Sequence, residues 1–274
     1  MLIKENSSIL IPIDFSKQSL IAIEQSYSIA KFTKSKIIIM HVSPKSNTER
    51  QTELDELVAT TMKNSGQPTE SLNLKGDIYE LIDAKATELD CALIVTALDK
   101  QAKLRSFMGV TNVGKFIKQA PCPIFTIHSE DNRNNCRNIL IHIDLSAESR
   151  EKVGTAVQFA KYYNATIKII CVFGPNDEKL ENELLPYLNQ VKKFIKDRGV
   201  SCTNKSIASN NVAEAIVNYA NNNDCDIIIQ MNKKDMSIGE MLSGDLSLKV
   251  IETSNIPVLS VKPMVRVSIS SSVH

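Results

Sequence analysis

Two short stretches of the chain place a carboxylate and a hydroxyl at the end of an isoleucine-rich run. They are Asp14-Phe15-Ser16 and Asp144-Leu145-Ser146. A serine acts as a nucleophile only with a base within hydrogen-bond reach, and the sequence shows no histidine or lysine partner for either serine. A serine between a strand pattern and a helical pattern is instead typical of a helix N-cap. We therefore expect Ser16 and Ser146 to cap helices.

Histidine and cysteine, the residues best suited to metal binding, are few and scattered. The four histidines include no close pair, and the six cysteines include no C-x-x-C pair or zinc-like spacing, so we expect no metal site. His41 is expected at the rim of a crevice, and His142 at the end of a strand. Cys91, Cys171 and Cys225 lie within apolar runs, which favours reduced, buried thiols and a reducing cytoplasm.

The charge and hydropathy of the chain exclude several classes of partner. The 274 residues carry 32 basic and 31 acidic side chains, so no broad attraction to nucleic acids or anionic membranes is expected. The apolar runs are strand-sized, well short of the roughly 20 residues that span a bilayer. The first residues lack the pattern of a signal peptide. These features predict a cytoplasmic protein with neither nucleic-acid nor membrane partners.

An internal repeat explains the length of the chain. Residues Ile9–Ser16 reappear as Ile139–Ser146, which is 130 residues later. Further along, the spacing becomes 134, as between Gly76–Glu80 and Asn210–Glu214. One four-residue insertion reconciles the two spacings, and such an ordered series of matches indicates a duplicated unit.

The boundary between the two copies lies in a polar stretch without periodicity, residues 129–135. We expect one domain at 1–130, called copy one, and a second at 137–264, called copy two. The serine-rich tail, residues 265–274, either frays or adds an edge strand.

Each copy alternates β-rich runs with amphipathic helical patterns. This alternation predicts an α/β fold with a parallel sheet covered by helices on both faces. We expect two tandem doubly wound five-stranded sheets of order 3-2-1-4-5, with ligand crevices at the carboxyl ends of the first and fourth strands. The strands expected in copy one are 9–15, 36–42, 72–74, 91–97 and 124–128.

Several of these features together resemble the universal stress protein family. They are the two Asp-x-Ser strand ends, His41-Val42 after the second strand, the fourth strand Ala92–Val95, and Ala120–Ile124 with its counterpart Asn255–Val258. The resemblance implies the doubly wound fold and a non-catalytic role in stress response.

One branch of that family binds ATP through a glycine loop after the fourth strand: glycine, two residues, glycine, nine residues, glycine, then serine or threonine. Glycines let the backbone approach phosphate, and the last two residues open a helix whose N–H groups hold it. In copy one these positions fall on Ala97, Lys100, Val110 and Thr111, with Gly109 one place early. In copy two they fall on Met231, Lys234, Gly244 and Asp245.

Neither copy therefore has the full ATP-binding pattern. The Asp245 carboxylate opposes phosphate, which Lys234 offsets only in part. The resemblance still implies candidate nucleotide contacts at Pro12, Asp14, Val42, Ala97, Gly109 and Thr111 in copy one and at Asp144, Val172, Met231 and Gly244 in copy two. For Asp14 and Asp144, capping of the following helix is an equal alternative.

The sequence leaves two functional hypotheses open. The first is a non-catalytic stress-response module without a cofactor, whose partners are proteins or its own copies. The second is a sensor that binds ATP or AMP weakly through one degraded site. An ATP-cleaving enzyme is disfavoured, because the chain has no Ser-Gly-Gly-x-Asp phosphate loop.

The resemblance also implies how the two copies associate. In this family the fifth strands commonly pair across a dimer interface. A tandem chain can satisfy that pairing internally, with Ile124–His128 beside Val258–Lys262 as an intramolecular pseudo-dimer. A homodimer of the whole chain is the alternative.

Overall fold

The computed structural model describes residues 3–43, 48, 50–98, 116–127, 135–232 and 245–263. The strands of copy one are β1 Ser8–Ile13, β2 Lys36–Ser43, β3 Thr69–Lys75, β4 Cys91–Ala97 and β5 Ile124–Ile127. Those of copy two are β6 Asn138–His142, β7 Thr166–Phe173, β8 Cys202–Ala208, β9 Ile227–Met231 and β10 Val258–Val261. The helices are α1 Lys17–Thr33, α2 Gln51–Ser65, α3 Ile78–Glu88, α5 Ala147–Tyr163, α6 Glu178–Lys196, α7 Val212–Asn222 and α9 Leu246–Thr253.

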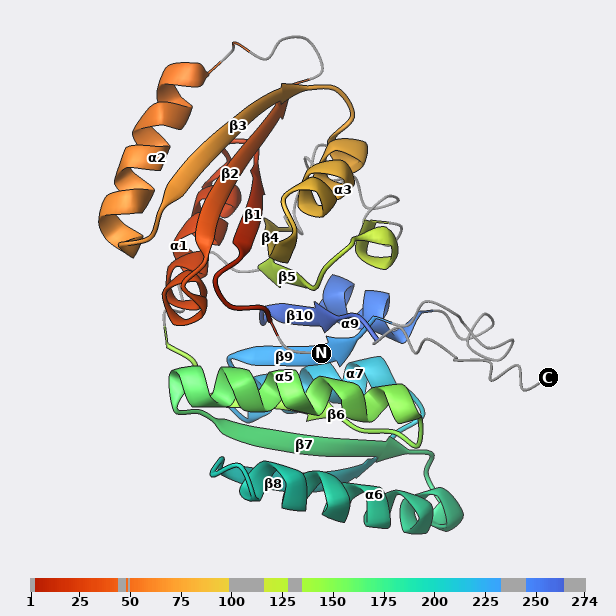
Figure 1. Ribbon diagram of the computed structural model, residues 1–274. Coiled ribbons are helices and arrows are strands. Elements are labelled where there is room, and N and C mark those ends of the chain that lie inside the picture. The colour runs from red at the N-terminus through yellow and green to blue at the C-terminus, as the bar shows by residue number, and fades with distance from the viewer. Residues whose placement is uncertain are drawn as a thin grey trace, which may run out of the picture.

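The ten strands form one continuous sheet in the order β3-β2-β1-β4-β5-β10-β9-β6-β7-β8 (Figure 1). Each half is parallel, and its order of 3-2-1-4-5 confirms the fold class predicted from the sequence. The halves are not separate sheets, however, because β5 and β10 pair antiparallel with Phe125 opposite Leu259. This pairing satisfies backbone groups that would otherwise be exposed at two strand edges.

Both faces of the sheet are buried, as the apolar strands require. All six residues of β1 are buried, and alternate side chains enter two cores. Ile9 and Ile11 pack with residues of α1, α2, α5 and α6 on one face. Leu10 packs with residues of α3, α7 and α9 on the other. A doubly covered parallel sheet has this pattern.

Several strand ends differ from those expected. The strand expected at 9–15 ends at Ile13, because Phe15 has a φ of +62°, a left-handed conformation outside the β region. The strand expected at 72–74 runs from Thr69 to Lys75, since each of these residues pairs with a residue of β2. β5 ends at Ile127, and His128 lies outside the described residues.

The serines expected to cap helices do so. The Ser16 hydroxyl oxygen accepts the N–H of Ser19 at 3.2 Å and begins α1. The Ser146 hydroxyl oxygen accepts the N–H of Ser149, also at 3.2 Å, and begins α5. Their hydroxyls therefore have a structural role at the starts of these two helices.

A second contact between the copies lies between α1 and α5. The ring of Phe32 stacks on that of Tyr162 with centroids 5.1 Å apart. The backbone N–H of Ile3 donates to the side chain of Gln158, which in turn donates to the Ile3 carbonyl, each at 2.8 Å. The helices as well as the central strands thus join the two copies.

We predict that the central strand pair supports the stability of the whole chain. Leu259→Ala leaves a cavity in a fully buried position and should lower the free energy of unfolding by about 2–5 kcal/mol. Leu185→Ala, at a side chain that is 43% exposed, should change it by less than about 0.5 kcal/mol. Urea denaturation followed by circular dichroism measures both, and equal losses would contradict the packing described.

Candidate functional site

In copy one, the carboxyl ends of β2, β1 and β4 bring several expected site residues to one edge of the sheet. β1 lies between β2 and β4, with Ile13 opposite His41. Pro12 and Val42 are buried within their strands, and Asp14 and Ala97 are half-buried at the strand ends. Gly109 and Thr111, the remaining candidates of this copy, lie outside the described residues.

Asp14 is engaged through one oxygen. Its Oδ1 accepts the N–H of Ser16 at 2.9 Å, which supports the turn into α1. Within the described parts of the chain, this is the one hydrogen bond that the carboxylate accepts. Capping and ligand binding are therefore compatible at Asp14, because the second oxygen is available to a ligand.

An aromatic and cationic group lies beside Asp14. The rings of Phe15 and His41 meet edge to face with centroids 5.0 Å apart, and the Arg50 guanidinium lies 4.7 Å from the Phe15 ring centroid. Phe15 and Arg50 both have left-handed backbones, with φ of +62° and +61°. Such conformations cost about 1–3 kcal/mol for non-glycine residues and cluster at functional sites.

The corresponding edge of copy two is occupied by its own polar side chains. Asp144 Oδ1 accepts both the N–H and the hydroxyl of Ser146, at 2.9 and 2.5 Å. The Asp144 N–H donates to the Ser149 hydroxyl oxygen at 3.0 Å. Copy one lacks this arrangement, because there the Ser19 hydroxyl donates to the carbonyl of Ser16.

A buried lysine completes the network of copy two. Lys152 on α5 is only 4% exposed, and its Nζ donates to the Ser149 hydroxyl oxygen at 3.3 Å. Its counterpart in the repeat is Ala22, which is also buried. The pKa of the nearby Cys171 thiol is raised to about 11, chiefly by burial; the Asp144 charge also raises this pKa, and the Lys152 charge lowers it. Both charges of the network therefore act on the same buried thiol.

The position that holds the last hydroxyl of the ATP-binding pattern is occupied in copy two by a fully engaged carboxylate. Asp245 Oδ1 accepts the N–H groups of Ser247 and Leu248 at 2.9 and 3.3 Å, at the start of α9. Asp245 Oδ2 lies 2.9 Å from Nζ of Lys118, which belongs to copy one. This carboxylate has the backbone donors and the cation that a bound phosphate would need.

The first glycine of the ATP-binding pattern is replaced in copy two by a buried side chain, that of Met231. Met231 ends β9, its side chain is 5% exposed, and its carbonyl accepts the Ser247 hydroxyl at 2.8 Å. Val172 is buried in β7, and Gly244 lies outside the described residues. The methionine fills space where the pattern calls for bare backbone.

Three participants were not found by sequence reasoning. Lys118 pairs with a residue more than a hundred positions away, and Arg50 reaches Phe15 through a left-handed turn; no local pattern indicates either contact. The sequence did contain an indication of Lys152. Superposing the repeats places this lysine opposite Ala22, on the buried face of α5.

No group of three histidine, cysteine, aspartate or glutamate side chains in the described residues is placed to hold a metal ion. None of the described helices combines the length and hydropathy needed to cross a membrane.

The strand order and the helices on both faces define a duplicated doubly wound α/β protein. The model of the universal stress protein family matches residues 5–128 and 135–262, and the chain belongs to this family. No curated protein matches the chain.

Two solved structures that span most of this chain have the same fold. A universal stress protein from Archaeoglobus fulgidus DSM 4304 is 17% identical, with a TM-score of 0.71 over 94% of this chain and 97% of that one. A putative universal stress protein from Pseudomonas aeruginosa UCBPP-PA14 is 19% identical, with a TM-score of 0.70 over 93% of each chain. A universal stress protein in complex with cAMP is 21% identical and covers 47% of this chain and 98% of that one, with a TM-score of 0.41.

We predict that the hydroxyl network matters more in copy two than in copy one. Ser149→Ala removes the acceptor of both the Asp144 N–H and the Lys152 amine and should cost about 1–3 kcal/mol of unfolding free energy. Ser19→Ala, the equivalent change in copy one, removes one hydroxyl-to-carbonyl bond and should cost about 1 kcal/mol or less. Urea denaturation compares the two variants, and a larger loss for Ser19→Ala would refute the asymmetry.

Proposed function

We propose that this protein is a cytoplasmic, non-catalytic stress-response module whose second copy has lost polyphosphate binding. The observation that carries the proposal is the Asp245 carboxylate at the start of α9, held by two N–H groups and paired with Lys118. A phosphate at this helix terminus would have to displace the carboxylate or lie beside it. Two negative charges about 4 Å apart repel each other by about 1–4 kcal/mol.

The nucleoside end of the same crevice supports the proposal. Asp144 Oδ1 already accepts two hydrogen bonds from Ser146, and the buried amine of Lys152 bonds to Ser149. A ribose or base approaching Asp144 would compete with these short internal contacts. Each broken contact at a buried charged group costs more than a neutral hydrogen bond gains.

The arrangement of the two copies fits a regulatory role through protein contacts. The antiparallel β5–β10 pair uses the sheet edges of both copies within one chain. Among the described elements, the helices and the outer strands β3 and β8 remain for contacts with partners. We propose that the clients are proteins and that the chain acts as an intramolecular pseudo-dimer.

A nucleotide sensor that uses copy one is the second candidate, and a specific feature favours it. Asp14 keeps one carboxylate oxygen available. Copy one has Ala22 at the position where copy two has the buried Lys152. Phe15, His41 and Arg50 supply an aromatic ring, an imidazole and a cation at the same strand end. In this candidate function, ATP or AMP binds weakly to copy one alone.

We predict that Asp245→Ser creates a phosphate site in copy two. The change removes the charge, retains an N-capping hydroxyl, and takes away the carboxylate that lies 2.9 Å from the Lys118 amine. Isothermal titration calorimetry with ATP should show at least about tenfold tighter binding than the wild-type chain, as expected from a gain above about 1.4 kcal/mol.

The double variant Asp245→Ser with Lys118→Met is the matched control. It retains the serine but lacks the cation, so most of the gain should disappear. If Asp245→Ser binds ATP no more tightly than the wild type, the carboxylate is not what excludes phosphate. Tight ATP binding to copy two of the unaltered chain would overturn the proposed function.

A further inference from the structure

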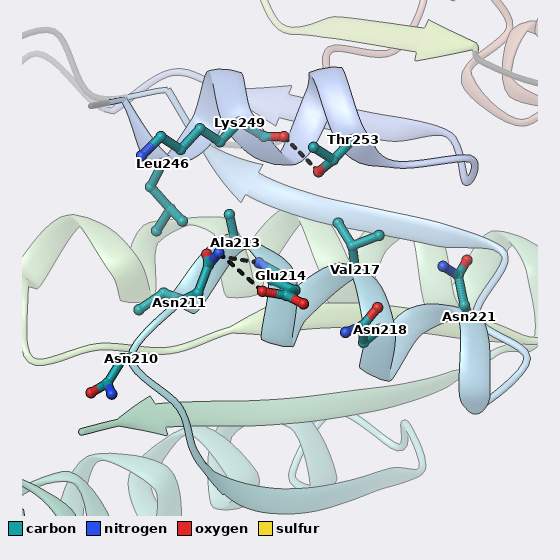
Figure 2. Close-up of a pocket in the computed structure, with 11 residues that line it drawn as sticks. Asn210, Asn211, Ala213, Glu214, Val217, Asn218, Asn221, Leu246, Lys249 and Thr253 are labelled. Atoms are coloured by element: carbon teal, nitrogen blue, oxygen red, sulfur yellow. Dashed lines mark hydrogen bonds between the residues drawn. The ribbon is translucent and has the colours of Figure 1, made fainter. Parts of the chain in front are cut away.

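A groove lies between α7 and α9, and Asp14, Asp144 and Asp245 are not among its lining residues. It has a volume of about 860 Å³ and belongs wholly to copy two (Figure 2). Its floor is apolar, with Ala213 and Val217 on α7 and Leu246 on α9. Its walls are polar, with four asparagines, Glu214, Lys249 and Thr253. Ligand sites in proteins have volumes of about 300–1,000 Å³.

The equivalent groove of copy one is much smaller, at about 310 Å³. Tyr79 stands there at the position of Ala213, and its ring lies 6.0 Å from that of Phe116, whose counterpart is Val250. The rim of the smaller groove carries three carboxylates, Asp77, Glu80 and Asp83. The two copies thus share their strand order, but aromatic rings fill the groove of copy one, whereas the groove of copy two is open.

The open groove carries a row of amide groups. Asn210, Asn218 and Asn221 are exposed, and their side chains make no hydrogen bond within the described part of the chain. Asn211 is already engaged, because it caps α7 and donates to Glu214 at 3.1 Å. An asparagine side chain offers both a donor and an acceptor, which matches the N–H and C=O of a peptide unit.

The chemistry of the lining disfavours other ligand classes. One acidic and one basic side chain, Glu214 and Lys249, give the rim no excess charge for a phosphate or a polyamine. None of the described lining residues is aromatic, so neither a nucleobase nor a sugar ring finds a stacking surface. Apolar floor positions between amide groups suit alternating side chains of an extended chain.

We propose that this groove binds an extended, uncharged peptide segment of a partner protein. The 11 residues of α7 span roughly 16 Å, which matches about five residues of an extended peptide. The asparagines bond its backbone, and small apolar side chains enter the floor. This inference rests on the regulatory role proposed above and names the class of partner.

The test uses an array of acetylated and amidated octapeptides in which alanine or valine alternates with serine, threonine or glutamine. The full-length chain should bind a subset of them. Ala213→Tyr, which copies the filled groove of copy one, should weaken the binding at least tenfold. Asn218→Ala combined with Asn221→Ala should weaken it about tenfold, and Asn222→Ala, exposed on the same helix outside the groove, should leave it unchanged.

Thermal unfolding verifies that each variant is folded, and the exposed asparagine variants keep the test valid if Ala213→Tyr is unstable. Binding that survives in folded Ala213→Tyr, or that is lost equally in Asn222→Ala, would overturn the proposal, as would an array with no bound octapeptide. The array contains no nucleotide, so any of these failures leaves the assignment of the crevices standing.

Discussion

A carboxylate lies at the N-terminus of helix α9, where a bound phosphate would otherwise lie. The first N–H groups of α9 have no partner within the helix. Together with the helix dipole they favour a negative charge at this end, from a side chain or from a bound anion. In this chain the negative charge is that of Asp245, which is tethered and therefore present at all times. Lys118 adds a cation from the other copy at 2.9 Å. A diffusible phosphate competes with an internal anion that loses little entropy on binding.

The antiparallel pairing of β5 and β10 makes the ion pair between Lys118 and Asp245 possible. It brings the helical turn that carries Lys118, at residues 116–119, next to the start of α9. Asn232 and Lys262 of copy two likewise donate to the carbonyls of Ile117 and Ala120. At the strand ends of copy two, Asp144 Oδ1 accepts the Ser146 hydroxyl, and the side chains of Lys152 and Met231 are buried.

Much of the fold was predictable from the sequence, because its signals are local. The apolar runs indicated β1, β2 and β4, and their alternation with helical patterns indicated the doubly wound sheet. Ser16 and Ser146 indicated the helix starts. The edge strand β3 was predicted too short, since its polar residues alternate weakly and its extent is set by pairing with β2. In the site, the strand-end aspartates were predictable, whereas Lys118 and Arg50 were not, because their partners are joined only by the tertiary fold.

The backbone amides of Ser247 and Leu248 report most directly on the central claim. In the wild-type chain labelled with nitrogen-15, titration with ATP should leave their NMR chemical shifts unchanged, because Asp245 Oδ1 already accepts both N–H groups. Saturable shifts of these two amides at micromolar ATP would show that phosphate reaches the start of α9, and would contradict the account.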